Sequence, residues 1–189
     1  GRMNLRLAKT DLFAELDETV FTFRERALRD GIEVKYSIPE VPAIANADAN
    51  RLKQVFMNIL DNALKYSRSP SKIFVKAEFT KLDNQNFVKI AIADQGCGIS
   101  KEDLPHVKEK FYKANVSVRG SGIGLAVTNE IVNLHHGKLE IDSQEGKGTL
   151  VTIYLPVENS PTKNELNDMK QNETVQDAEI NEGVEINKN

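Results

Sequence analysis

Apolar residues between positions 10 and 157 switch repeatedly between helical and strand spacing, and this alternation is the strongest constraint on the fold. Thr10 or Asp11 can cap a first helix, because a side-chain oxygen there accepts hydrogen bonds from the free N–H groups of the first turn. The Asp30-Gly31 pair is expected to end this helix, since glycine readily adopts the left-handed conformation past a helix terminus. The apolar residues that follow the helical spacing are Leu12, Leu16, Val20, Phe23 and Ala27.

The remaining periodicity predicts two more long helices and five strands. The helices are expected at 49–66, capped by Asp48 or Asn50, and at 122–135, with a short helix near 101–108. The strands are expected at 32–38, 72–79, 87–93, 138–143 and 149–155. A polar turn, Lys81–Asn86, joins the second and third strands and favours a hairpin.

Residues 158–189 differ sharply in composition from the rest of the chain. They contain eight acidic residues against three lysines, a net charge of −5, whereas the whole chain carries −3. They contain no aromatic residue, so we expect too little apolar burial to offset the entropy of ordering, and therefore a disordered acidic tail. The other 157 residues suit one domain with its own core.

Composition also excludes several classes of protein. No apolar run approaches the ~18 residues of a membrane span. A single cysteine, Cys97, excludes a disulfide framework within the chain. With three histidines and no C-x-x-C pair, structural zinc is not expected. A nearly neutral body without a basic stripe predicts no binding to nucleic acid.

The second helix has a polar stripe on an otherwise apolar pattern. Asn58, Asn62, Lys65 and Tyr66 lie three, four or eight positions apart and so share one helical face. The amide oxygen of Asn62 can bind Mg²⁺, which prefers hard oxygen ligands. The lysine can neutralise phosphate charge. The alternative interpretation is a solvated helix face.

A glycine-rich turn, Asp94–Ile99, follows the strand expected at 87–93. An ionised Asp94 can accept a hydrogen bond from the exocyclic amine of adenine. Guanine would present a carbonyl oxygen there and leave two acceptors face to face, so the carboxylate would discriminate between the bases. The alternative is a tight turn in which the carboxylate is a local acceptor.

A second glycine-rich segment, Gly120–Ala126, opens the third helix. Its glycines and the helix N-terminus offer N–H groups to phosphate. The spacing is neither the dinucleotide fingerprint, which would need glycine where Leu125 stands, nor a P-loop. A flexible hinge at the start of the helix is the alternative.

Two further segments complete the pattern. Gly146–Thr149 lies between the last two strands and is also compatible with an ordinary hairpin turn. Lys110–Arg119 contains basic residues and no core periodicity, which predicts a lid whose cations reach a triphosphate, or else a surface loop anchored by Phe111 and Tyr112.

These segments, in this order, resemble the ATP-binding catalytic domain of sensor histidine kinases, in the superfamily shared with DNA gyrase, the heat-shock chaperone ATPase and the mismatch-repair ATPase. The asparagine box of that family resembles Asn58–Tyr66, and its first glycine box resembles Asp94–Gly98. The phenylalanine box resembles Phe111-Tyr112, with the later glycine boxes at Gly120–Gly124 and Gly146–Thr149. The resemblance covers about residues 10–157 and implies an α/β two-layer sandwich. A mixed sheet of about five strands would pack under three helices, with the ATP lid between the phenylalanine box and the second glycine box.

The family assigns a role to each matching position. Asn62 would bind Mg²⁺, Asn58 would lie near the γ-phosphate, and Lys65 and Lys113 would contact phosphate. Tyr66 and Thr149 would lie near the adenine read by Asp94. The backbone of the glycine boxes would form the phosphate site and the side of the pocket next to the adenine, the base wall. The residues concerned are Gly96, Gly98, Ile99, Gly120, Ser121, Gly122, Ile123, Gly124 and Leu125.

Asn58 separates the branches of this superfamily. The gyrase-like and chaperone-like ATPases have glutamate there, which can act as a general base toward water, and a neutral amide cannot. The resemblance therefore implies a kinase that donates the γ-phosphate of ATP to a histidine on a separate dimerisation domain in two-component signalling. An ATP-gated interaction module or ATPase of the same superfamily is the alternative.

No histidine of this chain matches the phosphoacceptor motif, so His106, His135 and His136 are expected to be structural or surface residues. The acceptor would then belong to a domain that is missing here, with residues 1–9 as the remnant of its linker. The family also implies a response regulator downstream and a cytoplasmic location, with a parent protein that is often anchored in a membrane. The isolated domain is expected to be a monomer.

Overall fold

The computed structural model describes residues 2–110, 112–113, 122, 124–186 and 188. Five strands form the main sheet in the order β2 (Ile32–Ser37), β4 (Ser71–Leu82), β5 (Gln85–Asp94), β7 (Gly148–Pro156) and β6 (Lys138–Gln144). β2 runs parallel to β4 and the other neighbours are antiparallel, so the sheet is mixed, as the resemblance implied. The expected hairpin is present, with Asp83 and Asn84 at positive φ in its turn.

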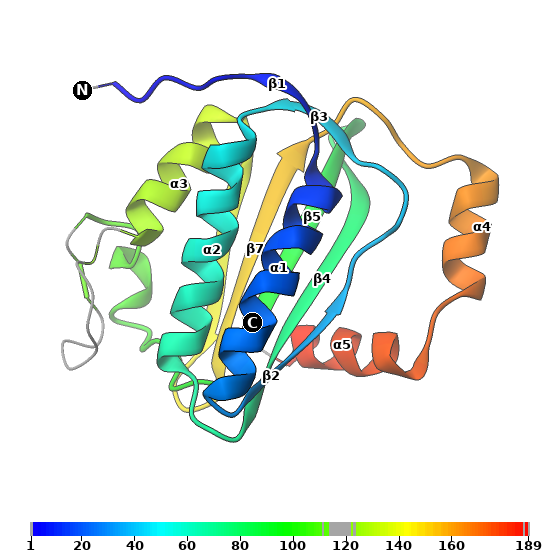
Figure 1. Cartoon of the computed structure of the whole chain (residues 1–189). Coiled ribbons are helices and arrows are strands. Elements are labelled where there is room, and N and C mark those ends of the chain that lie inside the picture. Colours follow the sequence, from blue (N-terminus) through cyan, green and yellow to red (C-terminus); the bar gives the residue numbers. More distant parts are fainter. Residues whose placement is uncertain (1, 111, 114–121, 123, 187, 189) are drawn as a thin grey trace.

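Three helices cover one face of this sheet: α1 (Leu12–Arg29), α2 (Ala49–Tyr66) and α3 (Gly124–Leu134) (Figure 1). Their apolar stripes and the inner side chains of the strands form one core cluster. The two-layer α/β sandwich predicted from the sequence is therefore confirmed. A short 3₁₀ helix, Leu104–His106, occupies part of the region where a short helix was expected.

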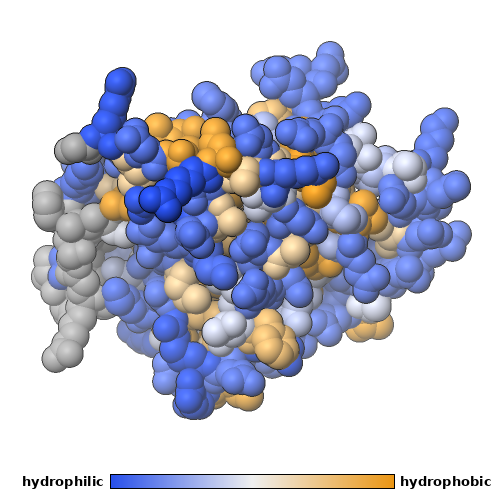
Figure 2. Space-filling model, turned by 45° about the horizontal axis from the view of Figure 1, so that its top comes forward, coloured by the Kyte–Doolittle hydropathy of each residue, from blue (hydrophilic) through white to orange (hydrophobic). Residues whose placement is uncertain are grey.

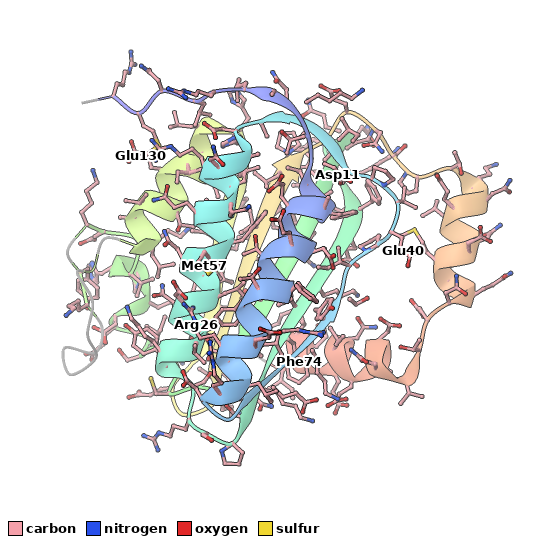
Figure 3. The ribbon with its side chains drawn as sticks, viewed as in Figure 1. Asp11, Arg26, Glu40, Met57, Phe74 and Glu130 are labelled. Atoms are coloured by element: carbon pink, nitrogen blue, oxygen red, sulfur yellow. The ribbon has the colours of Figure 1, made fainter. Side chains whose placement is uncertain are left out.

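Aspartates cap both long helices. The Asp11 side chain accepts from the backbone N–H groups of Phe13 and Ala14, and the Asp48 side chain accepts from that of Arg51. An ion pair between Arg26 and Asp61 joins α1 to α2, and Figure 3 shows the arginine between the two helices. These contacts fix the start and orientation of α2, which holds the polar residues Asn58, Asn62, Lys65 and Tyr66, the asparagine stripe.

A small second sheet was not expected. β1 (Ala8–Asp11) pairs antiparallel with β3 (Ile44–Ala47) just before α1 and α2 begin. Each strand has only four residues, too few for a clear alternation, and their pairing joins segments far apart in the sequence. The small sheet brings the starts of the two helices together.

The expectation of a disordered tail is wrong for its described residues. They form α4 (Lys163–Gln171) and α5 (Val175–Glu185), and each helix starts with a capping box, Thr162 with Glu165 and Thr174 with Asp177. α5 packs on the outer face of the sheet and buries Ile180 and Val184. Average composition concealed these local capping signals and the i, i+4 apolar pair. α4 stands away from the sheet (Figure 1) and buries none of its side chains.

The molecular surface is mostly hydrophilic in the view of Figure 2, where apolar side chains form separate patches. Large apolar residues with exposed side chains include Leu7, Phe21, Leu28 and Leu134. Among the described residues, no helix combines the length and apolar character that crossing a membrane requires.

Candidate functional site

A cavity of about 460 Å³ lies between α2, the start of α3 and the ends of β5 and β7. It brings together most of the residues that the sequence predicted for a nucleotide site. The predicted residues that line it are Asn58, Asn62, Lys65, Tyr66, Asp94, Gly98, Ile99, Lys113, Gly122, Gly124, Leu125 and Thr149. Gly120, Ser121, Ile123 and most of the expected lid lie outside the described residues.

Gly96 shapes the cavity wall from behind. Its N–H donates to Asp94 Oδ1 over 2.9 Å. A Cβ at this position would lie 2.4 Å from the carbonyl oxygen of Tyr66, so only glycine allows the turn to approach the end of α2 this closely. The Cys97 N–H donates to the same carbonyl over 3.2 Å. The first glycine box is thereby joined to the helix with the asparagine stripe.

The asparagine stripe of α2 faces the cavity. Asn58 Nδ2 lies 3.4 Å from Thr128 Oγ1, a contact that orients the amide against α3. No hydrogen bond from the described part of the chain uses the Asn62 amide, which lines the cavity with Lys65 and Lys113. Two cations and an amide oxygen therefore border the same space.

The donor set fits a magnesium ion held mainly by a bound phosphate group. The Asn62 oxygen is a hard ligand, and Mg²⁺ commonly binds one or two protein oxygens together with substrate phosphates and waters. Within the described residues, no three His, Cys, Asp or Glu side chains gather to hold a metal by themselves. A nucleotide would have to supply the other ligands.

Asp94 is the buried acidic residue of the cavity, with 7% of its surface exposed. Burial raises the pKa of its carboxyl to about 6, against the opposing effect of hydrogen bonds from the N–H groups of Gly96 and Thr149. Both donors bind Oδ1, at 2.9 and 3.3 Å. The end of β5 thus presents a fixed acceptor that changes charge close to neutral pH.

Sequence reasoning missed Ser143, a buried residue at the end of β6. Its hydroxyl accepts from the Ile99 N–H, contacts the Thr149 hydroxyl and donates to the Gly148 carbonyl, each over 2.8 Å. This side chain joins the first glycine box to the last. The sequence signal that could have identified it is the alternation of side chains along the strand. Ser143 is a polar residue at the position that shares the inner face with Leu139 and Ile141.

Tyr112 of the phenylalanine box is anchored by Asp103, which accepts a hydrogen bond from its hydroxyl. This bond lowers the pKa of the Asp103 carboxyl and raises that of the Tyr112 hydroxyl. The His106 ring lies 5.4 Å from the Tyr112 ring, centroid to centroid. Phe111 lies outside the described residues. The anchor places the neighbouring Lys113 at the cavity.

The histidines occupy structural or surface positions, as predicted. His135 is buried, and its Nδ1 lies 2.8 Å from the Ile131 carbonyl while its Nε2 accepts from the Asp48 N–H over 3.0 Å. It therefore connects the end of α3 to the cap of α2. His106 and His136 are exposed.

Residues 47–159 match the family described as histidine kinase-, DNA gyrase B-, and HSP90-like ATPase. The non-motile and phage-resistance protein of Caulobacter vibrioides is 34% identical over 86% of this chain. The signal transduction histidine-protein kinase BaeS of Escherichia coli is 30% identical over 84%. The chain therefore belongs to this family, as the ATP-binding catalytic domain of a sensor histidine kinase.

Solved structures agree with this placement. The mycobacterial sensor histidine kinase MprB is 28% identical, with a TM-score of 0.65 over 81% of this chain and all of that one. The catalytic domain of histidine kinase ThkA, at 21% identity, shares the fold with a TM-score of 0.69, over 80% of this chain and 96% of that one. The chain spans 20% of the Caulobacter protein and 34% of BaeS.

Proposed function

We propose that this domain binds Mg·ATP in the cavity and donates the γ-phosphoryl group to a histidine on a separate dimerisation domain. Three features that meet in one cavity support this most strongly. They are the asparagines of α2, the buried Asp94, and the cations Lys65 and Lys113. In this proposal the catalytic domain includes β1, whose Ala8 and Lys9 pair with Ala47 and Asn46 of β3, and the phosphoacceptor histidine belongs to another domain.

Each residue that the sequence predicted for the site has a role in this proposal. Asp94 accepts a hydrogen bond from the adenine amine, with Tyr66 and Thr149 near the base. Asn62 ligates Mg²⁺, which, when bound, neutralises phosphate charge and orients the triphosphate. Lys65 and Lys113 contact phosphate. The glycine segments provide backbone N–H groups and close approach: Gly96, Gly98, Ile99, Gly120, Ser121, Gly122, Ile123, Gly124 and Leu125.

Phosphoryl transfer suits such a site because it depends mainly on positioning and charge neutralisation. A nitrogen of the acceptor imidazole attacks the γ-phosphorus, the bond from this phosphorus to the β–γ bridging oxygen breaks, and ADP leaves. Asn58 lies where a hydrolytic enzyme needs a base. Its neutral amide orients groups near the γ-phosphate without activating water, which favours transfer over hydrolysis.

The histidine-bearing partner, a response regulator that receives the phosphoryl group and a cytoplasmic location are parts of the same proposal. They are supported by relatives such as BaeS, which is named a signal transduction histidine-protein kinase, and WalK of Staphylococcus epidermidis, which is named a sensor protein kinase. An ATP-gated interaction module or ATPase is the second candidate, and Asn58 argues against it.

The test is transfer in trans. The purified chain is mixed with an isolated dimerisation domain from a related sensor kinase and with γ-labelled ATP. We expect acid-labile label on that domain, lost when its phosphoacceptor histidine is replaced by glutamine or when this chain has Asn62→Ala. Rapid release of free phosphate without labelling of any of several dimerisation domains would favour the ATPase.

A further inference from the structure

Helix α5 lies on the outer face of the sheet, opposite the nucleotide cavity. Ile180 and Val184 pack there with Phe74, Ala91, Ala93 and Leu150 in a second apolar cluster. Figure 3 shows Phe74 beside α5. α4, which connects α5 to the domain, buries no side chain, so α5 is held by its own contacts with the sheet.

The residues under α5 are the immediate neighbours of those that face the cavity. Ala93 precedes Asp94, and Leu150 follows Thr149, with Ala93 and Leu150 paired across β5 and β7. Because successive side chains of a strand point to opposite faces, α5 covers the back of the strand ends whose front forms the base wall. The hydrogen bond from the Thr149 N–H to Asp94 Oδ1 joins the same two strands.

A second line of contact runs from α5 to the first glycine box. Glu179 binds the ammonium groups of Lys35 and Lys72 at 2.7 and 2.6 Å. The backbone N–H of Lys72 donates to Gln95 Oε1 over 2.9 Å. Gln95 lies directly between Asp94 and Gly96 in the turn that forms the base wall. Lys72 therefore connects Glu179 of α5 to this turn.

The close fit of α5 depends on Gly183. A Cβ there would lie 2.4 Å from two carbon atoms of the Phe74 ring, which allows no side chain without displacement of the ring or the helix. The glycine lowers the intrinsic helix propensity of α5. It is therefore explained by close docking and not by the needs of the helix.

We propose that α5 is a positioning element for the adenine end of the nucleotide site, acting through the strands from the opposite face of the sheet. This inference rests on the proposed ATP site. Docked α5 holds the ends of β5 and β7 in the register that aligns Asp94 with Thr149. Release of the helix loosens this alignment and weakens nucleotide binding, while the asparagine stripe on α2 stays in place.

The test uses two docking variants with matched controls in the full chain. Gly183→Gln places a side chain against Phe74, and Ala178→Gln adds the same side chain at an exposed position of the same helix. Ile180→Asp places a charge in the buried contact. Its control, Gln176→Asp, introduces the same side chain at an exposed position of the helix. ATP affinity is measured by calorimetry at a temperature where all variants are folded. Amide hydrogen exchange is followed in the nucleotide-free protein.

We expect both docking variants to raise the dissociation constant for ATP about fivefold or more, a typical coupling between distant sites, and both controls to leave it unchanged. In the nucleotide-free protein the amides of Gly96 and Thr149 should exchange faster, with those in the middle of α2 unaffected. Unchanged exchange at these two amides in variants whose α5 amides have lost protection would overturn the inference. Equal affinity for ATP in those variants would overturn it as well.

The two measurements separate this inference from the proposed function. Absence of ATP binding by the wild-type chain would reject the ATP site, whereas exchange at Gly96 and Thr149 still reports whether α5 holds the base wall. Uniformly faster exchange throughout α2 would show a general loss of stability and would contradict a specific positioning role.

Discussion

The backbone N–H of Thr149 donates to Oδ1 of Asp94 over 3.3 Å, joining two glycine-flanked segments that are 55 residues apart in the sequence. The same oxygen accepts from Gly96, and Ser143 binds the Thr149 hydroxyl from the side. The end of the cavity assigned to adenine is thus formed by a hydrogen-bonded junction of three strand ends.

Ionisation of Asp94 should destabilise the nucleotide-free fold. Its folded pKa of about 6 lies above the ordinary carboxyl value of 3.8, so the unfolded chain gives up this proton at lower pH than the folded chain. The stability that neutral Asp94 provides is complete below pH 4 and is lost as the pH rises toward 6. Two units of pKa correspond to at most about 3 kcal/mol.

The measurement is the free energy of unfolding of the wild type and Asp94→Asn, by urea titration between pH 4 and 7. The variant should gain stability relative to the wild type as the pH rises. A difference that stays constant across this range would contradict the raised pKa.

Asp94 should also select the base. Replacing its carboxylate by an amide in Asp94→Asn supplies a donor that can face the guanine carbonyl, so the preference for ATP over GTP should fall about tenfold or more. Competition binding at pH 7.5 measures the ratio, with Asp83→Asn in the exposed hairpin turn as the matched control. An unchanged ratio would mean that the base lies elsewhere.

Ser143→Ala should weaken the site and the fold together. The substitution leaves the Ile99 N–H and the Gly148 carbonyl without this hydroxyl, at a cost of about 1–3 kcal/mol in unfolding free energy. The affinity for ATP should also decrease, because the Thr149 hydroxyl loses its hydrogen bond with the Ser143 hydroxyl. Ser160→Ala, at an exposed position, should change neither quantity. Equal unfolding midpoints for the two variants in urea would refute the structural role.

Hydrolysis of ATP by the isolated chain should be very slow. Asn58 provides no base, so turnover should stay far below about 1 s⁻¹, the lower end of typical enzyme rates. Phosphate release measured with saturating Mg·ATP tests this, and Asn62→Ala protein purified in parallel gives the contaminating background. Turnover at ordinary enzymatic rates above that background would require another base and would favour the ATPase interpretation.

The sequence predicted the parts of the fold that depend on local signals. Asp11 and Asp48 cap the helices as expected, and the apolar stripes of α1 and α2 are buried. The pairing of β1 with β3 was missed because it depends on contacts between distant, very short segments. α5 was missed because its stability comes from an outer sheet face whose apolar residues, such as Phe74 and Ala93, are not recognisable as a separate cluster in the sequence.

The candidate site shows a similar division. Residues with an expected chemical role, such as Asn62 and Asp94, line one cavity. Ser143 has no role of that kind, and its importance follows only from the three groups that meet at its hydroxyl.

Thermal and chemical unfolding with ATP, in the presence and absence of Mg²⁺, tests the central claim of a Mg·ATP site most directly. Ligand at ~100 times its dissociation constant should stabilise the wild type by about 2.7 kcal/mol. Asn62→Ala should lose the part of this stabilisation that depends on Mg²⁺, and Asn133→Ala, on the exposed side of α3, should retain it. Equal Mg²⁺-dependent stabilisation of the wild type and Asn62→Ala, or no stabilisation of the wild type by millimolar ATP, would contradict the account.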